Sequence, residues 1–338
     1  MHLRESERKQ GTPWFSIIQG FYIEAKIAFM DEWNAAVKDN DTGSFPFGEE
    51  PLLWKTIGDE ILFTKVLSDY RQLGFVLRCW IRTLDKLRVF LKSRDARLDI
   101  KSTAWIAGFP VKNKDVVLSN SHKLFNDQVD NYIVESGNLL NAYYENPTTE
   151  DVTVDFVGPS VDVGFRLATQ ATARRFVVSV GIPYILSLTT PADEDLEDEI
   201  RFHFGGSVAL KGVFGGIPYP LFWIDMGESR TSATLEDALT GEKYCEPRHV
   251  QQYCAAFYKE QLSYTFRPFI YEESEHKLHH RPEWYDSQLA VLIDEFLNPT
   301  TAITEGKDPP KSVRPKKGPS AEAIFAGLSF VKEDKQDP

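Results

Sequence analysis

The 338-residue chain has few cysteines, no long apolar run and no excess of positive charge. Its three cysteines, Cys79, Cys245 and Cys254, are too few for a disulfide framework, and we expect free thiols in a reducing compartment. No apolar run approaches the roughly 20 residues of a membrane span, and the N-terminus lacks an apolar signal core. A net charge of −12 argues against nucleic acid as a partner, because nucleic-acid binders carry a basic face. We therefore expect a cytoplasmic protein that binds neither nucleic acid nor membrane.

Several common site motifs are missing as well. The sequence contains no Gly-Lys-Ser/Thr phosphate loop, no dinucleotide-binding glycine fingerprint and no Gly-x-Ser-x-Gly nucleophile elbow. The cysteines and histidines of residues 245–280 match no standard zinc spacing. Any catalytic site must therefore be built from other residues.

A strand–turn–strand pattern spans Pro51–Lys65, with the segment Lys55–Phe63 (KTIGDEILF) at its centre. Gly58-Asp59 is a common turn pair, so Asp59 is expected at the tip of a β-hairpin. A carboxylate held at a rigid strand end is a suitable ligand for magnesium or manganese.

Two further segments carry charged residues at the ends of predicted strands. Asp155–Leu167 (DFVGPSVDVGFRL) runs from a strand into a helix on which Asp162 and Arg166, four residues apart, share one face. Val208–Val213 (VALKGV) places Lys211 beside a glycine.

These three segments, in this order, resemble the class III nucleotidyl cyclases, which make a 3′,5′-cyclic nucleotide from a nucleoside triphosphate. The stand-alone form of the chain most resembles the pyrimidine (uridylate) cyclases of the bacterial anti-phage Pycsar system. The resemblance implies an α+β fold, a ferredoxin-like class III nucleotidyl cyclase domain with helices backing a mixed or antiparallel sheet. We expect this domain over residues 10–226, with an insertion at about 111–150. A helical extension over 227–298 and a linker with a docking tail over 299–338 follow.

The hydrophobic pattern predicts most of the individual elements. Residues 23–37 are ambiguous, because helical spacing is present and Ala25–Asp31 also reads as a buried strand. Strands are expected at 97–107, 153–156, 175–185, 200–204 and 219–224, and helices at 248–264 and 284–296. A long helix is expected after Ser68 or Asp69, with one apolar face made of Leu73, Leu77, Trp80, Leu84, Leu87 and Leu91.

The resemblance implies two divalent cations per site, Mg²⁺ or Mn²⁺, held by two aspartates. Asp59 matches the second of these residues. The family places the first at the end of its first strand, after a Phe-x-Asp pattern, and Phe29-Met30-Asp31 fits that pattern. The segment Phe15–Phe21 fits the spacing better but has Ile17 at the ligand position, which would leave the site one ligand short. We favour Asp31 and keep Ile17 as the alternative.

Lys55 and Asp155 match the two positions that bind the base in adenylate-making members. A donor beside an acceptor fits adenine, through N1 and N6–H, and uracil, through a carbonyl and N3–H. Guanine presents the reverse order, and unpaired buried groups would reject it. These two residues alone do not separate uracil from adenine.

Arg166 matches the arginine that stabilises charge on the α-phosphate, and Lys211 the lysine that binds the terminal phosphates. Asp162 stands where the family has an asparagine that orients the ribose; a simple helix salt bridge with Arg166 is the alternative. The predicted reaction is cyclisation of UTP to 3′,5′-cyclic UMP and pyrophosphate, and the product would activate a separate effector. The resemblance also implies a head-to-tail homodimer with two shared sites. The rival functions are an adenylate cyclase and a catalytically silent nucleotide-binding regulator.

Overall fold

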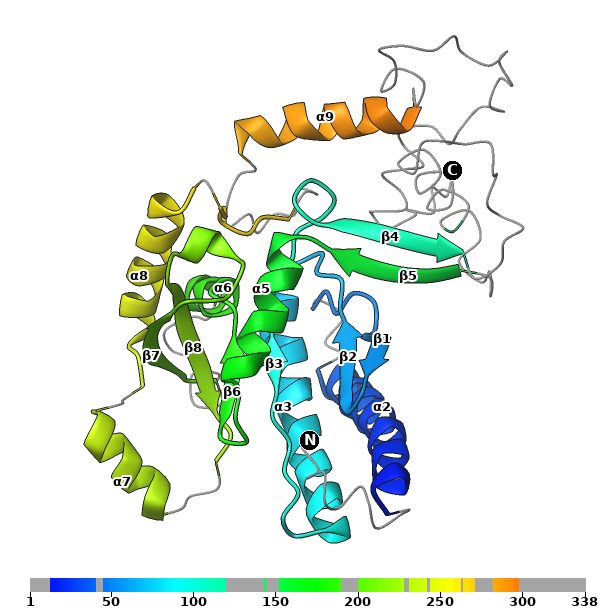
Figure 1. Ribbon diagram of the computed structural model, residues 1–338, viewed down its shortest axis with the longest axis vertical. Coiled ribbons are helices and arrows are strands. Elements are labelled where there is room, and N and C mark those ends of the chain that lie inside the picture. The colour runs from blue at the N-terminus through cyan, green and yellow to red at the C-terminus, as the bar shows by residue number, and fades with distance from the viewer. Residues whose placement is uncertain are drawn as a thin grey trace. The chain divides into compact units, whose positions relative to one another are not determined.

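The computed structural model describes residues 13–40, 45–119, 143, 152–189, 200–227, 231–241, 244–262, 264–270 and 282–297. The chain forms two compact units, the first of residues 1–106 and 160–280 and the second of residues 107–159 and 281–338. Helices and small sheets are mixed along the chain, so the fold is α+β, as predicted (Figure 1). No helix in the described ranges is both long and apolar enough to cross a membrane.

The first unit begins with helix α2 (Pro13–Asp39). Its buried residues recur every three or four positions, which is the repeat of one helix face packed on a core. The strand interpretation of Ala25–Asp31 is therefore wrong, and the helical one is confirmed. The buried residues of this face are Phe21, Ala25, Ala28, Phe29, Trp33 and Ala36.

The predicted hairpin is confirmed as β1 (Leu52–Ile57) and β2 (Glu60–Thr64), joined by the Gly58-Asp59 turn. Gly58 has φ +62°, a conformation that favours glycine. The Tyr22 hydroxyl of α2 donates a hydrogen bond to the Gly58 carbonyl, which holds the hairpin tip against the helix. Among the described strands, β1 and β2 pair only with each other.

Helix α3 (Arg71–Arg94) is the predicted long helix. The Asp69 carboxylate accepts a hydrogen bond from the Arg71 N–H at 2.8 Å, so it binds one of the first N–H groups of the helix. Five of the six predicted face residues are buried, and Trp80 is half-buried, with its indole N–H donating to Ser102 Oγ at 2.9 Å. The buried five are Leu73, Leu77, Leu84, Leu87 and Leu91.

The main sheet has four strands in the order β3-β6-β8-β7. β3 (Thr103–Ala104) runs parallel to β6 (Arg175–Val178). β8 (Tyr219–Asp225) lies antiparallel between β6 and β7 (Phe202–Val208). The two late strands are thus confirmed, whereas the strand expected over 97–107 is reduced to two residues.

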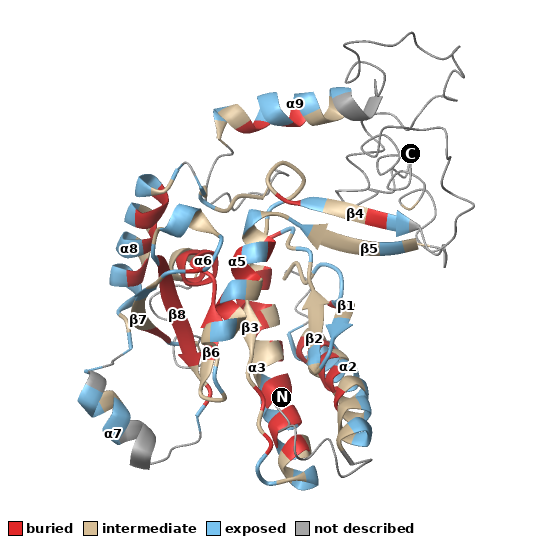
Figure 2. Ribbon diagram, in the orientation of Figure 1, coloured by how far each residue is buried: buried red, intermediate tan, exposed pale blue. Residues whose placement is uncertain are grey.

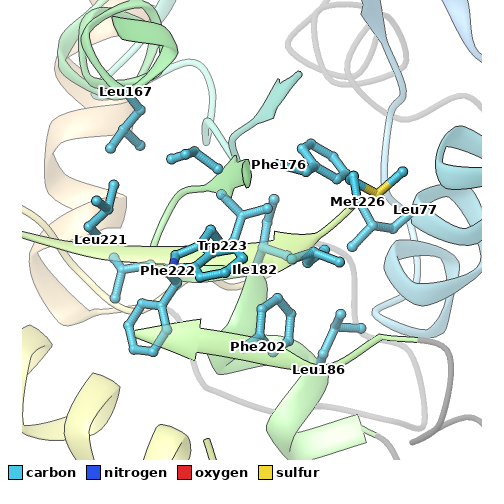
Figure 3. Packing of buried hydrophobic residues seen from close by; sticks show 14 of the residues in the cluster. Leu77, Leu167, Phe176, Ile182, Leu186, Phe202, Leu221, Phe222, Trp223 and Met226 are labelled. Carbon is cyan, nitrogen blue, oxygen red and sulfur yellow. The ribbon is translucent and has the colours of Figure 1, made fainter. Parts of the chain in front are cut away.

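Strand β8 runs through the middle of the core. Six of its seven residues are buried, and Figure 2 shows the strand in red. Figure 3 shows the surrounding side chains, with Phe202 and Phe222 on one side of the strand and Leu221 on the other. Trp223, in the same strand, has no exposed surface.

Helix α6 (Gly181–Thr189) replaces the second half of the strand expected over 175–185. Residues 181–186 are all buried, so their apolar run lacks the periodicity that distinguishes a helix from a strand. α6 packs against α8 (Pro247–Glu260) through Tyr184 and Tyr258. α8 confirms the helix predicted at 248–264.

The remaining elements of this unit are shorter. α7 (Thr231–Thr240) was not predicted. α5 (Pro159–Leu167) is the helix expected after the Asp155 segment, and its first residue lies at the boundary of the two units. The short 3₁₀ helices η2 (Ala168–Gln170) and η4 (Phe214–Gly216) complete the unit.

A buried arginine joins distant parts of this unit. Arg88 of α3 donates to the Asp99 carboxylate at 2.8 Å and to the carbonyl oxygens of Ala173, at 2.6 Å, and Met226. A buried guanidinium needs such partners, because an unpaired charge in the interior is strongly destabilising. Arg88 therefore connects α3 to the residues just before β6 and just after β8.

The second unit contains the antiparallel pair β4 (Lys114–Ser119) and β5 (Val152–Val157), and helix α9 (Glu283–Leu297). β5 and α9 confirm the strand predicted at 153–156 and the helix predicted at 284–296. β4 lies within the predicted insertion. Most other residues of that insertion, and the tail over 299–338, lie outside the described residues.

Candidate functional site

The predicted base-binding lysine lies at a bulge in the hairpin. Leu53 pairs with Phe63 and Lys55 pairs with Leu62, so Trp54 is an extra residue in β1. Such a bulge places two successive residues opposite one and redirects their side chains. The Lys55 ammonium consequently lies 4.4 Å from the centroid of the Trp54 ring.

Helix α5 meets the hairpin through Phe165. The centroid of its ring lies 5.9 Å from that of Trp54 and 5.5 Å from that of Trp105, and the Lys55 ammonium is 5.8 Å from the same ring. Gly164 permits this packing, because a Cβ atom there would lie 2.2 Å from the Trp105 ring. The aromatic set Trp54, Phe165 and Trp105 therefore joins the hairpin, the loop after β3 and α5.

Arg166 follows Phe165 and connects α5 to the third motif. Its Nε donates a hydrogen bond to the carbonyl oxygen of Lys211 at 3.0 Å. Lys211 is exposed in the turn after β7, next to Gly212, whose φ of +77° favours glycine. Asp162 and Arg166 are both exposed on α5, and among the described residues no ion pair joins them.

The structure thus brings together three of the predicted site residues within the first unit. Lys55 reaches Phe165, Phe165 is bonded to Arg166, and Arg166 binds the backbone of Lys211. Residues of the three motifs are therefore connected through α5, and each of the three carries a cationic side chain in a protein with a net charge of −12. Cationic side chains supplied by separate elements are suited to bind an anion with several phosphates.

Of the two predicted metal ligands, Asp59 lies where it was expected and Asp31 does not. Asp59 is half-buried in the hairpin turn, where a ligand was predicted. Asp31 is exposed in α2, so its assignment to a strand end is wrong, and Ile17 also lies in that helix. The described residues contain no group of three or more histidine, cysteine, aspartate or glutamate side chains that could hold a metal ion.

Asp155 lies in the second unit, in β5 opposite Val116 of β4. It is half-buried, and its Oδ1 accepts a hydrogen bond from the Phe156 N–H at 2.9 Å. The carboxylate is therefore anchored on its own strand.

The aromatic set was not predicted from the sequence. Trp54 and Phe165 each immediately precede a predicted basic site residue, and that adjacency was the available signal. Trp105 gave no local signal, because only the folded chain brings it to Gly164.

No protein family model, curated protein or solved structure matches this chain. The three motifs and the contacts between their residues are therefore the observations that bear on function.

Proposed function

We propose that this chain is a nucleotidyl cyclase that converts UTP to 3′,5′-cyclic UMP and pyrophosphate. The observation that carries the proposal is that α5 connects three separate motifs, since Phe165 contacts Lys55 and Arg166 binds the backbone of Lys211. The proposal includes a ferredoxin-like cyclase domain, which the α+β composition supports. By resemblance to the Pycsar cyclases, the product would signal phage infection to a separate effector.

In the proposed reaction the ribose O3′ forms a bond to the α-phosphorus while the bond from that phosphorus to the bridging oxygen of pyrophosphate breaks. The 3′-hydroxyl proton leaves to solvent. Arg166 would stabilise the negative charge that grows on the α-phosphate, and Lys211 the terminal phosphates. The exposed position of both side chains supports these roles, because they can reach a ligand.

Lys55 and Asp155 would select the base. Lys55 would donate to a uracil carbonyl, and Asp155 would accept from N3–H. Cytosine N3 carries no hydrogen, so this pair disfavours CTP, and a purine with the same donor and acceptor order, adenine, remains the competing base.

Mg²⁺ or Mn²⁺ would lower the pKa of the 3′-hydroxyl and hold the triphosphate. Asp59 offers a carboxylate of the type these ions prefer. The described residues of one chain do not form a metal-binding group around it, so Asp59 alone does not account for two ions. Turnover with and without Mg²⁺ or Mn²⁺ measures the metal requirement.

The surface around Asp59 supports a homodimer. The Tyr22–Gly58 hydrogen bond brings α2 to the hairpin tip, and the neighbouring side chains Ile23 and Ile57 are 59% and 44% exposed. Ile27, one helical turn after Ile23, is 50% exposed. Exposed apolar side chains on α2 and β1 would be covered by a second copy, which suits sites shared between subunits.

The first test is turnover. Purified protein with Mn²⁺ or Mg²⁺ is given UTP, CTP, ATP and GTP separately, and the products are resolved by mass. We expect cyclic UMP from UTP, and a loss of activity of about 100-fold or more in Arg166→Gln. The matched control is Arg97→Gln, which removes an exposed arginine paired with Asp95. No cyclic product from any of the four nucleotides would overturn the proposal.

Mixing two inactive variants tests the shared sites. Asp59→Asn and Arg166→Gln are co-expressed with different tags. If each site takes Asp59 from one subunit and Arg166 from the other, random pairing restores about a quarter of wild-type activity. A mixture as inactive as its components would show that each chain carries its own site, and full activity of Asp59→Asn alone would show that Asp59 has no role.

The second candidate is a nucleotide-binding regulator without turnover. The helical location of Asp31 and Ile17, neither at a strand end, favours it. This candidate predicts tight binding of a nucleoside triphosphate and no product, with or without added metal ions.

A further inference from the structure

The bulge in β1 brings an indole ring to the lysine that the proposed reaction uses for the base. The Lys55 ammonium lies 4.4 Å from the centroid of the Trp54 ring. Trp54 is half-buried, and its Nε1 atom is buried. Indole rings offer a broad apolar face on which a planar group can stack.

We propose that Trp54 is the stacking surface for the nucleotide base. The uracil ring lies against the indole, and the Lys55 ammonium turns from the indole to a uracil carbonyl. This inference rests on the proposed function, because it assumes that a nucleoside triphosphate binds along Lys55, Arg166 and Lys211. Stacking on an aromatic ring favours any base, so Trp54 supplies affinity while Lys55 supplies selectivity.

The surrounding contacts explain why the stacking ring is Trp54 rather than Phe165. Phe165 has aromatic neighbours on two elements, Trp54 and Trp105. Close packing of Gly164 against Trp105 fixes α5 at that point. Phe165 thus supports the Trp54 ring from α5. The interaction between Lys55 and Trp54 keeps the ring next to the lysine, since a cation is attracted to the face of an indole.

The test separates base stacking from general effects on the fold. Binding to the full-length protein is measured by calorimetry with 3′-deoxy-UTP, which lacks the attacking hydroxyl, and with ribose 5′-triphosphate, which lacks the base. We expect Trp54→Leu to weaken 3′-deoxy-UTP binding about tenfold, within the roughly 5- to 150-fold range of base stacking on aromatic rings. Trp54→Phe keeps a ring and should lose about threefold. Neither variant should change binding of the base-free triphosphate.

Trp284→Leu is the matched control, because Trp284 is also half-buried and has the Lys112 ammonium 5.4 Å from its ring centroid. It should bind both ligands like the wild type. Unchanged 3′-deoxy-UTP binding in Trp54→Leu would overturn the inference, and equal weakening of both ligands would assign Trp54 a purely structural role. If the wild type binds neither ligand and forms no cyclic product, the proposed function itself fails.

Discussion

Arg174 donates two hydrogen bonds to one oxygen of Asp225, at 3.1 Å from Nε and 2.8 Å from Nη2. Nη2 also lies 2.7 Å from both carboxylate oxygens of Asp237 in α7. These hydrogen bonds, that with Asp225 first, raise the pKa of Arg174 above its ordinary value. One guanidinium therefore links the end of β8 to a helix that the sequence did not predict.

Arg174→Gln should release α7 and lower the free energy of unfolding by about 1.5–3 kcal/mol, the range for hydrogen bonds to charged groups. The reason is that Asp225 and Arg174 are only 19% and 15% exposed, so water replaces the lost bonds poorly. Hydrogen exchange of residues 231–240 and urea denaturation measure the two effects. The exposed pair of Arg97 and Asp95 is the control: Arg97→Gln should change the midpoint much less. Unchanged exchange in α7 would contradict the prediction.

Gly164→Ala should destabilise the first unit by about 1–3 kcal/mol through overpacking against Trp105. The displaced helix should also carry Arg166 away from Lys211, so activity should fall further than stability. Gly108→Ala is the control, because its added methyl group meets nothing within 4 Å. Equal denaturation midpoints for the two variants would show that α5 moves without cost.

Three buried tyrosines and the buried Cys254 should lower the free energy of unfolding at alkaline pH. Burial raises the pKa of Tyr184, Tyr219 and Tyr258 above the ordinary tyrosine value, and that of the Cys254 thiol to about 12. The unfolded chain releases these protons at lower pH than the folded chain does. The contribution is therefore complete below about pH 9 and is lost as the pH rises toward the folded values.

Urea midpoints between pH 8 and pH 11 measure this loss. Tyr258→Phe removes one of the buried hydroxyls and should show a shallower decline than the wild type. The two proteins share every other titrating group, so equal slopes of midpoint against pH for the wild type and Tyr258→Phe would contradict the assignment.

Lys65 should titrate at unusually low pH. Burial lowers its pKa to about 8, although the charge of Glu49 acts in the opposite direction. The Lys65 ammonium donates to the Val66 carbonyl at 2.7 Å and lies 5.4 Å from the centroid of the Trp33 ring. Since the unfolded lysine keeps its proton up to about pH 10.5, this group makes stability rise from about pH 8 to 10.5.

Methyl-¹³C labelling of the lysines, followed by NMR titration, should reveal one resonance with a midpoint near pH 8. The signal should be missing in Lys65→Met. If every labelled lysine titrates near its ordinary value, Lys65 is better hydrated than its position between β2 and α2 suggests.

Elements with a clear repeat were predictable from the sequence. The leucines of α3 define one helix face, and the Gly58-Asp59 pair defines the hairpin turn. Helix α6 was not predictable in the same way, because its residues from Gly181 to Leu186 are all buried and show no periodicity. In α2 the apolar residues are so dense that they match both the helical repeat and the alternation of a strand. Packing against α3 stabilises the helix.

The residues of the candidate site also differ in how far the sequence predicts them. Lys55, Arg166 and Lys211 were identified from local motifs, and folding connects their segments through α5. The position of Trp54 depends on a register shift between two strands, which no single segment encodes. Asp31 was assigned from a three-residue pattern, and such a short pattern does not determine whether the chain around it is a strand or a helix.

The order of strands in the main sheet has a consequence for synthesis of the chain. β8 is the last of its four strands to be made, yet it pairs with both β6 and β7. The carbonyl that closes the Arg88 cluster belongs to Met226, one residue after β8. On the ribosome, β6 and β7 must therefore emerge with unpaired edges, which makes the nascent chain prone to aggregation until residue 226 is free. Chain truncation before β8 should abolish folding of the first unit altogether.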